Sequence, residues 1–208
     1  MNSEPSDKRR RLVTAVKPVY EKHRGEIEEK KHEQTHWESP DFIWEALLAS
    51  AATMGNPLGY ELIRNSSLHD PIRYAALRAL STDDERQTVL ADCLGKAQVR
   101  FSATKTQRLI ANLRRIESEG GPEAIKKELN LRVGSAAKIE FLRTFEGIGP
   151  KYARNMMMDV YHEDFRDSEK DYAGAESFFL NVAHEAGLSG WELDRLLFWY
   201  KGEVLASI

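Results

Sequence analysis

Segments in which apolar residues recur every three or four positions follow one another along most of the chain, a spacing typical of the buried face of an α-helix. Nowhere do Val, Ile and Thr alternate at a period of two over enough residues to predict a strand. The sequence therefore predicts an all-α protein. After a first buried helix from Phe42 to the turn at Gly55-Asn56-Pro57, the expected helices are Tyr60–Arg64, Pro71–Leu80, one that begins at the capping boxes Ser81-x-x-Asp84 and Thr82-x-x-Glu85, Ser102–Glu119, Pro122–Leu129, Ser135–Phe145, Pro150–Tyr161, Tyr172–Gly187 and Trp191–Ile208.

Size and composition narrow the class of protein. The chain has 208 residues, of which 41% are hydrophobic, enough to bury the core of one large or two small domains. Its longest apolar stretches fall well short of the roughly 18 residues that a membrane-spanning helix needs, and the amino terminus lacks the apolar core of a signal peptide. We therefore expect an intracellular protein in the cytoplasm.

Metal and cofactor sites are not expected. Cys93 is the single cysteine, so the sequence excludes an internal disulfide, a four-thiolate iron–sulfur cluster and a cysteine zinc site. The histidines at helical i, i+4 spacing, His32 and His36, lie in a charged segment that is typical of a solvated helix. Because the net charge is −3, nucleic-acid binding has to be argued from the local distribution of charge.

Composition also divides the chain into two regions. Residues 1–38 are predicted to form a charged N-terminal helix or arm, because Arg11 to Gln34 is dense in Lys, Glu and Arg and has few apolar residues. From Ser39-Pro40 onward the pattern becomes that of a folded core. Residues 39–208 are therefore expected to form the main helical region.

One turn in the main region has the features of a phosphate-binding element. The stretch from Phe141 to Ala153 joins two expected helices through Gly147-Ile148-Gly149-Pro150. Both glycines can adopt a positive φ, Ile148 can anchor the turn in the core, and Pro150 suits the first turn of a helix. A glycine turn that leads into a helix N-terminus presents unpaired amides and a positive dipole end, which can hold a DNA phosphate. The alternative is an ordinary connection between two helices with a glycine cap.

The same stretch resembles the helix-hairpin-helix signature of the DNA glycosylase superfamily, which includes endonuclease III, adenine-mismatch glycosylases and oxoguanine glycosylases. Six positions carry the match: Phe145, Gly147, Ile148, Gly149, Lys151 and Ala153. Residues 42–50 are similar to the family's first core helix, and residues 187–197 are similar to the tail of bacterial members that lack the iron–sulfur cluster. The resemblance covers residues 40–208, with the hairpin at residues 141–161.

The resemblance implies a fold of two helical subdomains with a cleft between them. It implies a monomer in the bacterial cytoplasm, at the nucleoid, that binds no membrane and whose partner is duplex DNA with a damaged base or an abasic site. Gly147, Ile148 and Gly149 would grip the DNA backbone, and Asn56 would lie near the lesion. Lys151 would be the catalytic nucleophile, since its neutral amine attacks C1′ of an extruded nucleotide to form a Schiff base that permits strand cleavage without a cofactor. Burial beside other cations would favour that neutral amine, whereas the alternative role of Lys151 is a contact to phosphate or solvent.

The catalytic aspartate of this family is not evident. The family places it after the lysine, with apolar residues before it and an Arg or His after it. From His162 to Asp171 this chain is mainly charged, so that segment is missing. Asp171 lies at the family's distance from Lys151 but lacks the apolar lead-in. It is the candidate second catalytic residue, and the alternative role is the N-cap of the next helix.

A run of basic residues supports a DNA-binding face independently of the resemblance. Between Asp92 and Glu117 the chain has no acidic residue and six cations: Lys96, Arg100, Lys105, Arg108, Arg114 and Arg115. Lys105 and Arg108 are the predicted DNA contacts among them. Such a cluster can neutralise several phosphates and make DNA affinity salt-dependent. The alternative is a solvated face that keeps the helix in solution.

The sequence favours a base-excision-repair enzyme, a DNA N-glycosylase and abasic-site lyase that acts through a Schiff base on Lys151. The alternative is a catalytically impaired DNA-binding protein that keeps the hairpin after losing the aspartate segment. A third interpretation is a general helical interaction module, which an acidic surface around residues 147–153 would favour.

Overall fold

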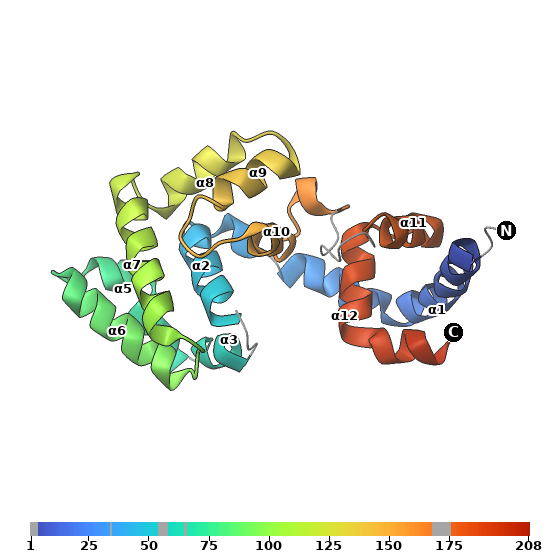
Figure 1. Cartoon of the computed structure of the whole chain (residues 1–208), viewed down its shortest axis with the longest axis horizontal. Coiled ribbons are helices and arrows are strands. Elements are labelled where there is room, and N and C mark those ends of the chain that lie inside the picture. The colour runs from blue at the N-terminus through green and yellow to red at the C-terminus, as the bar shows by residue number, and fades with distance from the viewer. Residues whose placement is uncertain (1–3, 34, 54–57, 65, 168–175) are drawn as a thin grey trace. The chain divides into compact units, whose positions relative to one another are not determined.

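The computed structural model describes residues 4–33, 35–53, 58–64, 66–167 and 176–208 (Figure 1). All regular secondary structure within these ranges is helical, which confirms the all-α prediction. No helix in the described part of the chain is both long and apolar enough to cross a membrane. The α-helices are α1 (Glu4–Glu33), α2 (Phe42–Thr53), α3 (Leu58–Ile63), α4 (Ser66–His69), α5 (Tyr74–Arg78), α6 (Asp83–Lys96), α7 (Ser102–Ser118), α8 (Pro122–Asn130), α9 (Gly134–Leu142), α10 (Pro150–Met158), α11 (Glu176–Ala186) and α12 (Gly190–Ala206), and the 3-10 helices are η1 (Thr35–Glu38), η2 (Asp70–Ile72) and η3 (Glu163–Phe165).

Capping and backbone conformation set the helix boundaries. Helix α6 begins where the Thr82 side chain accepts from the Glu85 N–H at 3.2 Å and the Glu85 carboxylate accepts from the Thr82 N–H at 2.9 Å, which is one of the two expected capping boxes. Helix α10 stops at Met158, earlier than the expected Tyr161, because Tyr161 itself has a left-handed φ of +50°.

The chain divides into two compact units. One unit comprises residues 38–153, and the other comprises residues 1–37 together with residues 154–208. The sequence-based division placed all of residues 39–208 in one region. In the structure, residues 154–208 group with the N-terminal helix instead.

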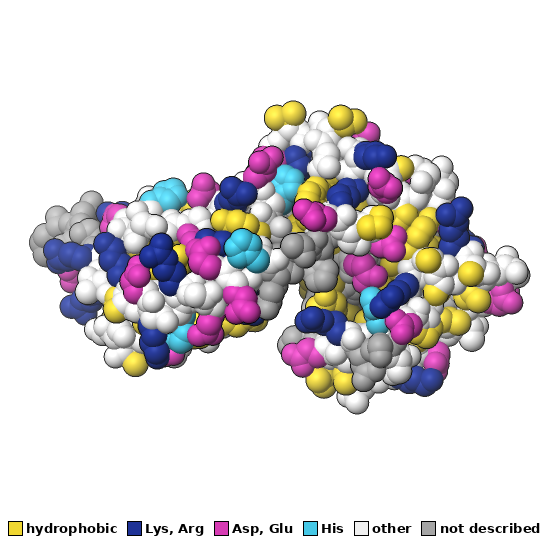
Figure 2. Space-filling view, turned by 180° about the vertical axis from the view of Figure 1, so that it is seen from behind, with side chains coloured by type: hydrophobic (Ala, Val, Ile, Leu, Met, Phe, Trp, Pro, Cys, Tyr) yellow, Lys and Arg dark blue, Asp and Glu magenta, His cyan; other side chains and the backbone are white. Residues whose placement is uncertain are grey.

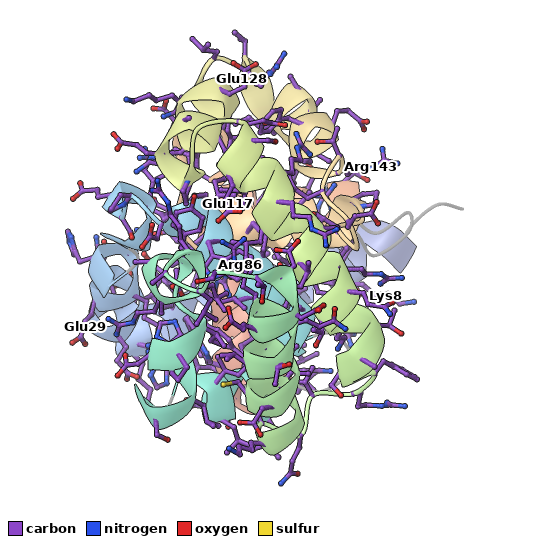
Figure 3. All side chains as sticks on the ribbon, turned by 90° about the vertical axis from the view of Figure 1, so that its left-hand side faces the viewer. Lys8, Glu29, Arg86, Glu117, Glu128 and Arg143 are labelled. Carbon is purple, nitrogen blue, oxygen red and sulfur yellow. The ribbon has the colours of Figure 1, made fainter. Side chains whose placement is uncertain are left out.

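Helix α2 is the central element of the unit formed by residues 38–153. It packs against α3, α7 and α8, and α6 runs beside α7 (Figure 1). Trp44 is fully buried, and its indole N–H donates to the Ile72 carbonyl at 2.8 Å. On the outer layer Arg86 of α6 donates to the Glu117 carboxylate of α7 at 2.9 Å (Figure 3). Its contacts with α2 and α6 position α7, the helix that carries most of the basic run.

Helix α1 packs against α11 and α12 in the other unit. Its few apolar residues lie on one face and are buried: Ala15, Val16, Val19, Tyr20 and Ile27. The charged residues of α1 occupy its remaining surface. On the face of this unit that Figure 2 shows, basic and acidic side chains are intermingled.

Candidate functional site

Residues 143–149, the hairpin turn, connect α9 to α10. Local hydrogen bonds close it: the Phe145 N–H donates to the Leu142 carbonyl at 3.1 Å, and the Ile148 N–H donates to the Phe145 carbonyl at 3.2 Å. The side chains of Phe145 and Ile148 are both buried. Ile148 therefore has the anchoring position that the sequence predicted for it.

The two glycines of the hairpin turn differ in conformation. Gly147 has a φ of +82°, and a Cβ at this position would lie 3.0 Å from Cδ of Arg108. Gly149 has no positive φ, and a Cβ there would meet open space. Of the two glycines that could adopt a positive φ, only Gly147 does so. Gly149 precedes Pro150, and a residue before proline favours extended backbone, which every residue type can adopt.

Asn112, a buried residue of α7, is hydrogen-bonded to the main chain of the hairpin turn. Asn112 donates from Nδ2 to the Glu146 carbonyl at 3.0 Å, and its Oδ1 accepts from the Glu146 N–H at 2.8 Å. Asn112 is 2% exposed, so these bonds are shielded from water. Sequence reasoning missed this residue. A polar residue at a buried position of a helix is the only local signal for it.

A cavity of about 20 Å³ lies beside the turn, where α2, α7 and the turn meet. This volume is of the order needed to hold one water molecule, and is far below that of a small-molecule site of roughly 300 Å³ or more. Its lining residues are Leu47, Ala51, Lys105, Arg108, Leu109, Asn112, Glu146, Gly147 and Ile148.

The two predicted DNA contacts on α7 have different environments. Arg108 is exposed and lies over Gly147. Lys105 is only 4% exposed. Burial lowers the pKa of the Lys105 ammonium, and the neighbouring charges of Arg100 and Arg108 lower it further. The buried amine beside other cations that was expected at Lys151 is thus found at Lys105.

The basic run has less uncompensated charge than its sequence suggests. Within the described part of the chain, acidic partners are seen for three of its cations: Lys96 with Asp92 at 2.7 Å, Arg114 with Asp83, and Arg115 with Glu119 at 2.8 Å. Arg115 also covers the Phe145 ring at 4.1 Å and donates to the Thr144 hydroxyl at 2.7 Å, so it supports the turn. The positive surface is therefore concentrated around Arg100 and Arg108.

Lys151 lies in the first turn of α10 and is exposed, rather than buried among cations as expected. Its amine can be reached from solvent. Asn56 and Asp171, the other predicted site residues, lie outside the described residues. Among the residues that the structure describes, no group of three or more His, Cys, Asp or Glu side chains could hold a metal ion.

Comparisons with known proteins give no assignment. A scan of protein-family models, a search of curated proteins and a search of solved structures each found no match to this chain. A functional assignment therefore depends on the geometry of the hairpin turn and on the resemblance in its sequence.

Proposed function

We propose that the chain binds duplex DNA through the hairpin turn and the adjoining surface of α7, and that Lys151 reacts there with an abasic site. One observation carries this proposal. A glycine in the left-handed conformation, Gly147, lies three residues before the start of α10, whose first turn carries an exposed lysine, Lys151. The first amides of a helix lack intrahelical acceptors and attract anions, and a lysine in the same turn adds a full positive charge.

The expected DNA contact is to the backbone. Main-chain amides and cations bind phosphate oxygens without reading the base sequence. Arg108 adds a second cation next to Gly147, since its side chain lies over that residue. Binding should therefore be largely independent of sequence and should weaken as salt rises.

Strand cleavage at an abasic site requires only one reactive amine from the protein, because the base is already absent. The neutral Lys151 amine attacks C1′ of the open-chain sugar aldehyde, and loss of water gives an imine. The imine acidifies the C2′ proton, and its removal breaks the C3′–O bond with phosphate as the leaving group. Hydrolysis of the imine then returns the free lysine. An exposed amine can reach such an aldehyde without first being buried.

Removal of a damaged base is the more demanding part of the proposal. It develops positive charge on the sugar, which a carboxylate has to stabilise, and it requires a cleft into which the nucleotide is extruded. The family's aspartate segment is missing from the sequence, and Asp171 is the candidate replacement. We therefore expect measurable cleavage at abasic sites and slow or absent excision of damaged bases.

Borohydride trapping tests the proposal, because reduction converts the imine into a stable amine linkage. The full chain is incubated with a duplex that contains one abasic site, and covalent adduct is measured. The unmodified protein and Lys127→Ala, which removes a lysine that is 75% exposed on α8, should form adduct, whereas Lys151→Ala should not. Duplex affinity should stay within a few-fold in all three proteins. Adduct formation by Lys151→Ala would overturn the assignment of the nucleophile.

A second candidate function is DNA binding without catalysis. The exposure of Lys151 and the small size of the cavity beside the turn favour it, since both suit a phosphate contact better than a reaction pocket. The same experiment separates the two functions. Tight, salt-dependent binding with no adduct in the unmodified protein would identify the non-catalytic one.

A further inference from the structure

The unit formed by residues 1–37 and 154–208 contains an apolar groove of about 840 Å³. It is framed by the first turns of α1, by α11 and by α12, which pack against one another (Figure 1). Its walls are mainly aliphatic and aromatic, and include Leu12, Phe178, Phe179, Leu193, Phe198 and Leu205. None of these residues belongs to the hairpin turn or α7, so the groove is separate from the proposed DNA-binding surface.

A bend in α12 shapes this groove. Tyr200 has non-helical backbone angles, with φ −120° and ψ 20°, and the helix changes direction there. The Tyr200 ring stacks on His23 of α1 at 3.7 Å, and its hydroxyl donates to the Glu26 carboxylate at 2.6 Å. Leu205, which follows the bend, and Ile208, beyond the end of α12, line the same groove as Phe198, which precedes the bend.

Large apolar side chains are exposed around the groove. Phe198 is 64% exposed, Leu205 is 58% exposed and Ile208 is 56% exposed. Leu193 and Val204, which also line the groove, are each only 1% exposed. Single exposed hydrophobic residues are ordinary, but several gathered over a concave apolar surface indicate a binding site.

The charges around the groove are mostly positive. Lys8 and Arg11 come from α1 and Lys201 from α12, against one acidic residue, Asp194. Arg11 lies 3.6 Å from Asp7, whereas within the described part of the chain neither Lys8 nor Lys201 has an acidic partner. Long basic side chains lay their methylene stems along apolar surfaces and keep their charged ends in water. The groove therefore offers an apolar interior with cations at its edge.

We infer that this groove binds a single-chain anionic amphiphile, a molecule of the fatty-acid class, with the tail against Phe198 and Leu205 and the head near Lys8 and Lys201. The volume lies within the roughly 300–1,000 Å³ range of small-molecule sites. The charge pattern matches one anionic head group rather than a neutral or cationic one. A flat membrane surface would leave a concave floor unfilled, so an individual amphiphile fits the shape better.

Calorimetric titration of the full chain with three ligands of equal tail length tests this inference. Dodecanoate, dodecanol and dodecyltrimethylammonium are compared below the concentrations at which they form micelles. Dodecanoate should bind one per chain and at least tenfold more tightly than dodecanol, with the cationic ligand weakest. Failure of dodecanoate to bind, or equal affinity for all three head groups, would overturn the inference.

Variants of residues that line the groove test whether dodecanoate binds there. Phe198→Asp should weaken dodecanoate binding at least tenfold, whereas Phe101→Asp, at an exposed phenylalanine in the other unit, should leave it unchanged. The double variant Lys8→Glu/Lys201→Glu should remove the preference for dodecanoate over dodecanol. Circular dichroism verifies that each variant keeps its helical content. Unchanged binding in Phe198→Asp would overturn the site, and a stable dimer that this variant dissociates would show that a second copy of the chain covers the groove instead.

Discussion

Asn112 and Glu146 are joined by two hydrogen bonds that pair one side-chain amide with both polar groups of one main-chain residue, at 3.0 Å and 2.8 Å. Glu146 immediately precedes Gly147, the residue with the left-handed φ. One side chain of α7 therefore fixes the entry to the proposed phosphate-binding turn. The same helix carries Arg108, so the turn and its nearest cation are held by a common support.

Replacing this amide by a carboxylate should destabilise the unit of residues 38–153. In Asn112→Asp a second acceptor faces the Glu146 carbonyl and a charge is buried, which should lower the free energy of unfolding by about 2–3 kcal/mol. Urea unfolding followed by circular dichroism measures the change. Asn181→Asp makes the same chemical change at an exposed position of α11 and should have little effect. Equal losses in the two variants would contradict a structural role for Asn112.

The two glycines of the hairpin turn should respond differently to alanine. Gly147→Ala forces a Cβ into the left-handed region and against Arg108, and should cost about 1–2 kcal/mol of unfolding free energy. Gly149→Ala should cost little, since its Cβ would meet open space. The loss of DNA affinity should follow the same order. Greater damage from Gly149→Ala, in stability or in affinity, would mean that the turn binds phosphate through a different conformation.

Much of the fold could be predicted from local signals. The start of α8 at Pro122 follows two glycines with φ of +95° and +99°, and the start of α6 follows the capping box of Thr82 and Glu85. Signals of this kind lie within a few residues of the boundary that they set. The grouping of residues 154–208 with α1 could not be predicted, because the buried face of α1 has few apolar residues among many charged ones.

The candidate site could be predicted only in part. Ile148 is an anchor by its chemistry alone, and Pro150 is a local signal that separates the two glycines, because a residue before proline favours extended backbone. Charge counting also overestimated the basic run, because the partner of Arg114 is Asp83, which lies on another helix. Contacts between residues far apart in the sequence leave no periodic pattern to detect.

Two arginines of α7 should differ in their effect on DNA binding. Arg108 is exposed beside the turn, whereas Arg114 is paired with Asp83. Arg108→Ala should weaken binding to any duplex sequence and reduce the slope of log affinity against log salt concentration by about one. Arg114→Ala should change the slope much less. Fluorescence anisotropy at several salt concentrations measures both, and equal slopes in the two variants would place the DNA elsewhere.

A buried ionic cluster should make the other unit sensitive to acid. Burial alone would raise the pKa of the Glu192 carboxyl, but hydrogen bonds from Lys31, the Ser189 N–H and Tyr20 outweigh it and hold that pKa below its ordinary value. A carboxyl with a lowered folded-state pKa stabilises the protein above its unfolded-state pKa of about 4.3, and this contribution is lost as pH falls through the folded value. Stability should therefore decline as the solution is acidified below about pH 5.

Glu192→Gln isolates that contribution. At pH 7 the variant should be less stable by roughly 1.5–3 kcal/mol, because it loses hydrogen bonds to a charged group, and the difference should narrow as pH falls. Urea unfolding at a series of pH values, followed by tryptophan fluorescence, measures this gap. A gap that stays constant from neutral to strongly acidic pH would contradict the assigned cause.

The most direct measurement is to identify the lysine that carries the DNA. After borohydride reduction on an abasic-site duplex, the protein is digested with protease and nuclease, and the peptide that bears the sugar fragment is sequenced by mass spectrometry. The proposed function predicts a single modified residue, Lys151, whose exposed amine lies at the start of α10. Modification at Lys105, whose pKa is lowered by burial, would move the nucleophile to α7. Absence of any modified lysine would contradict the lyase activity itself.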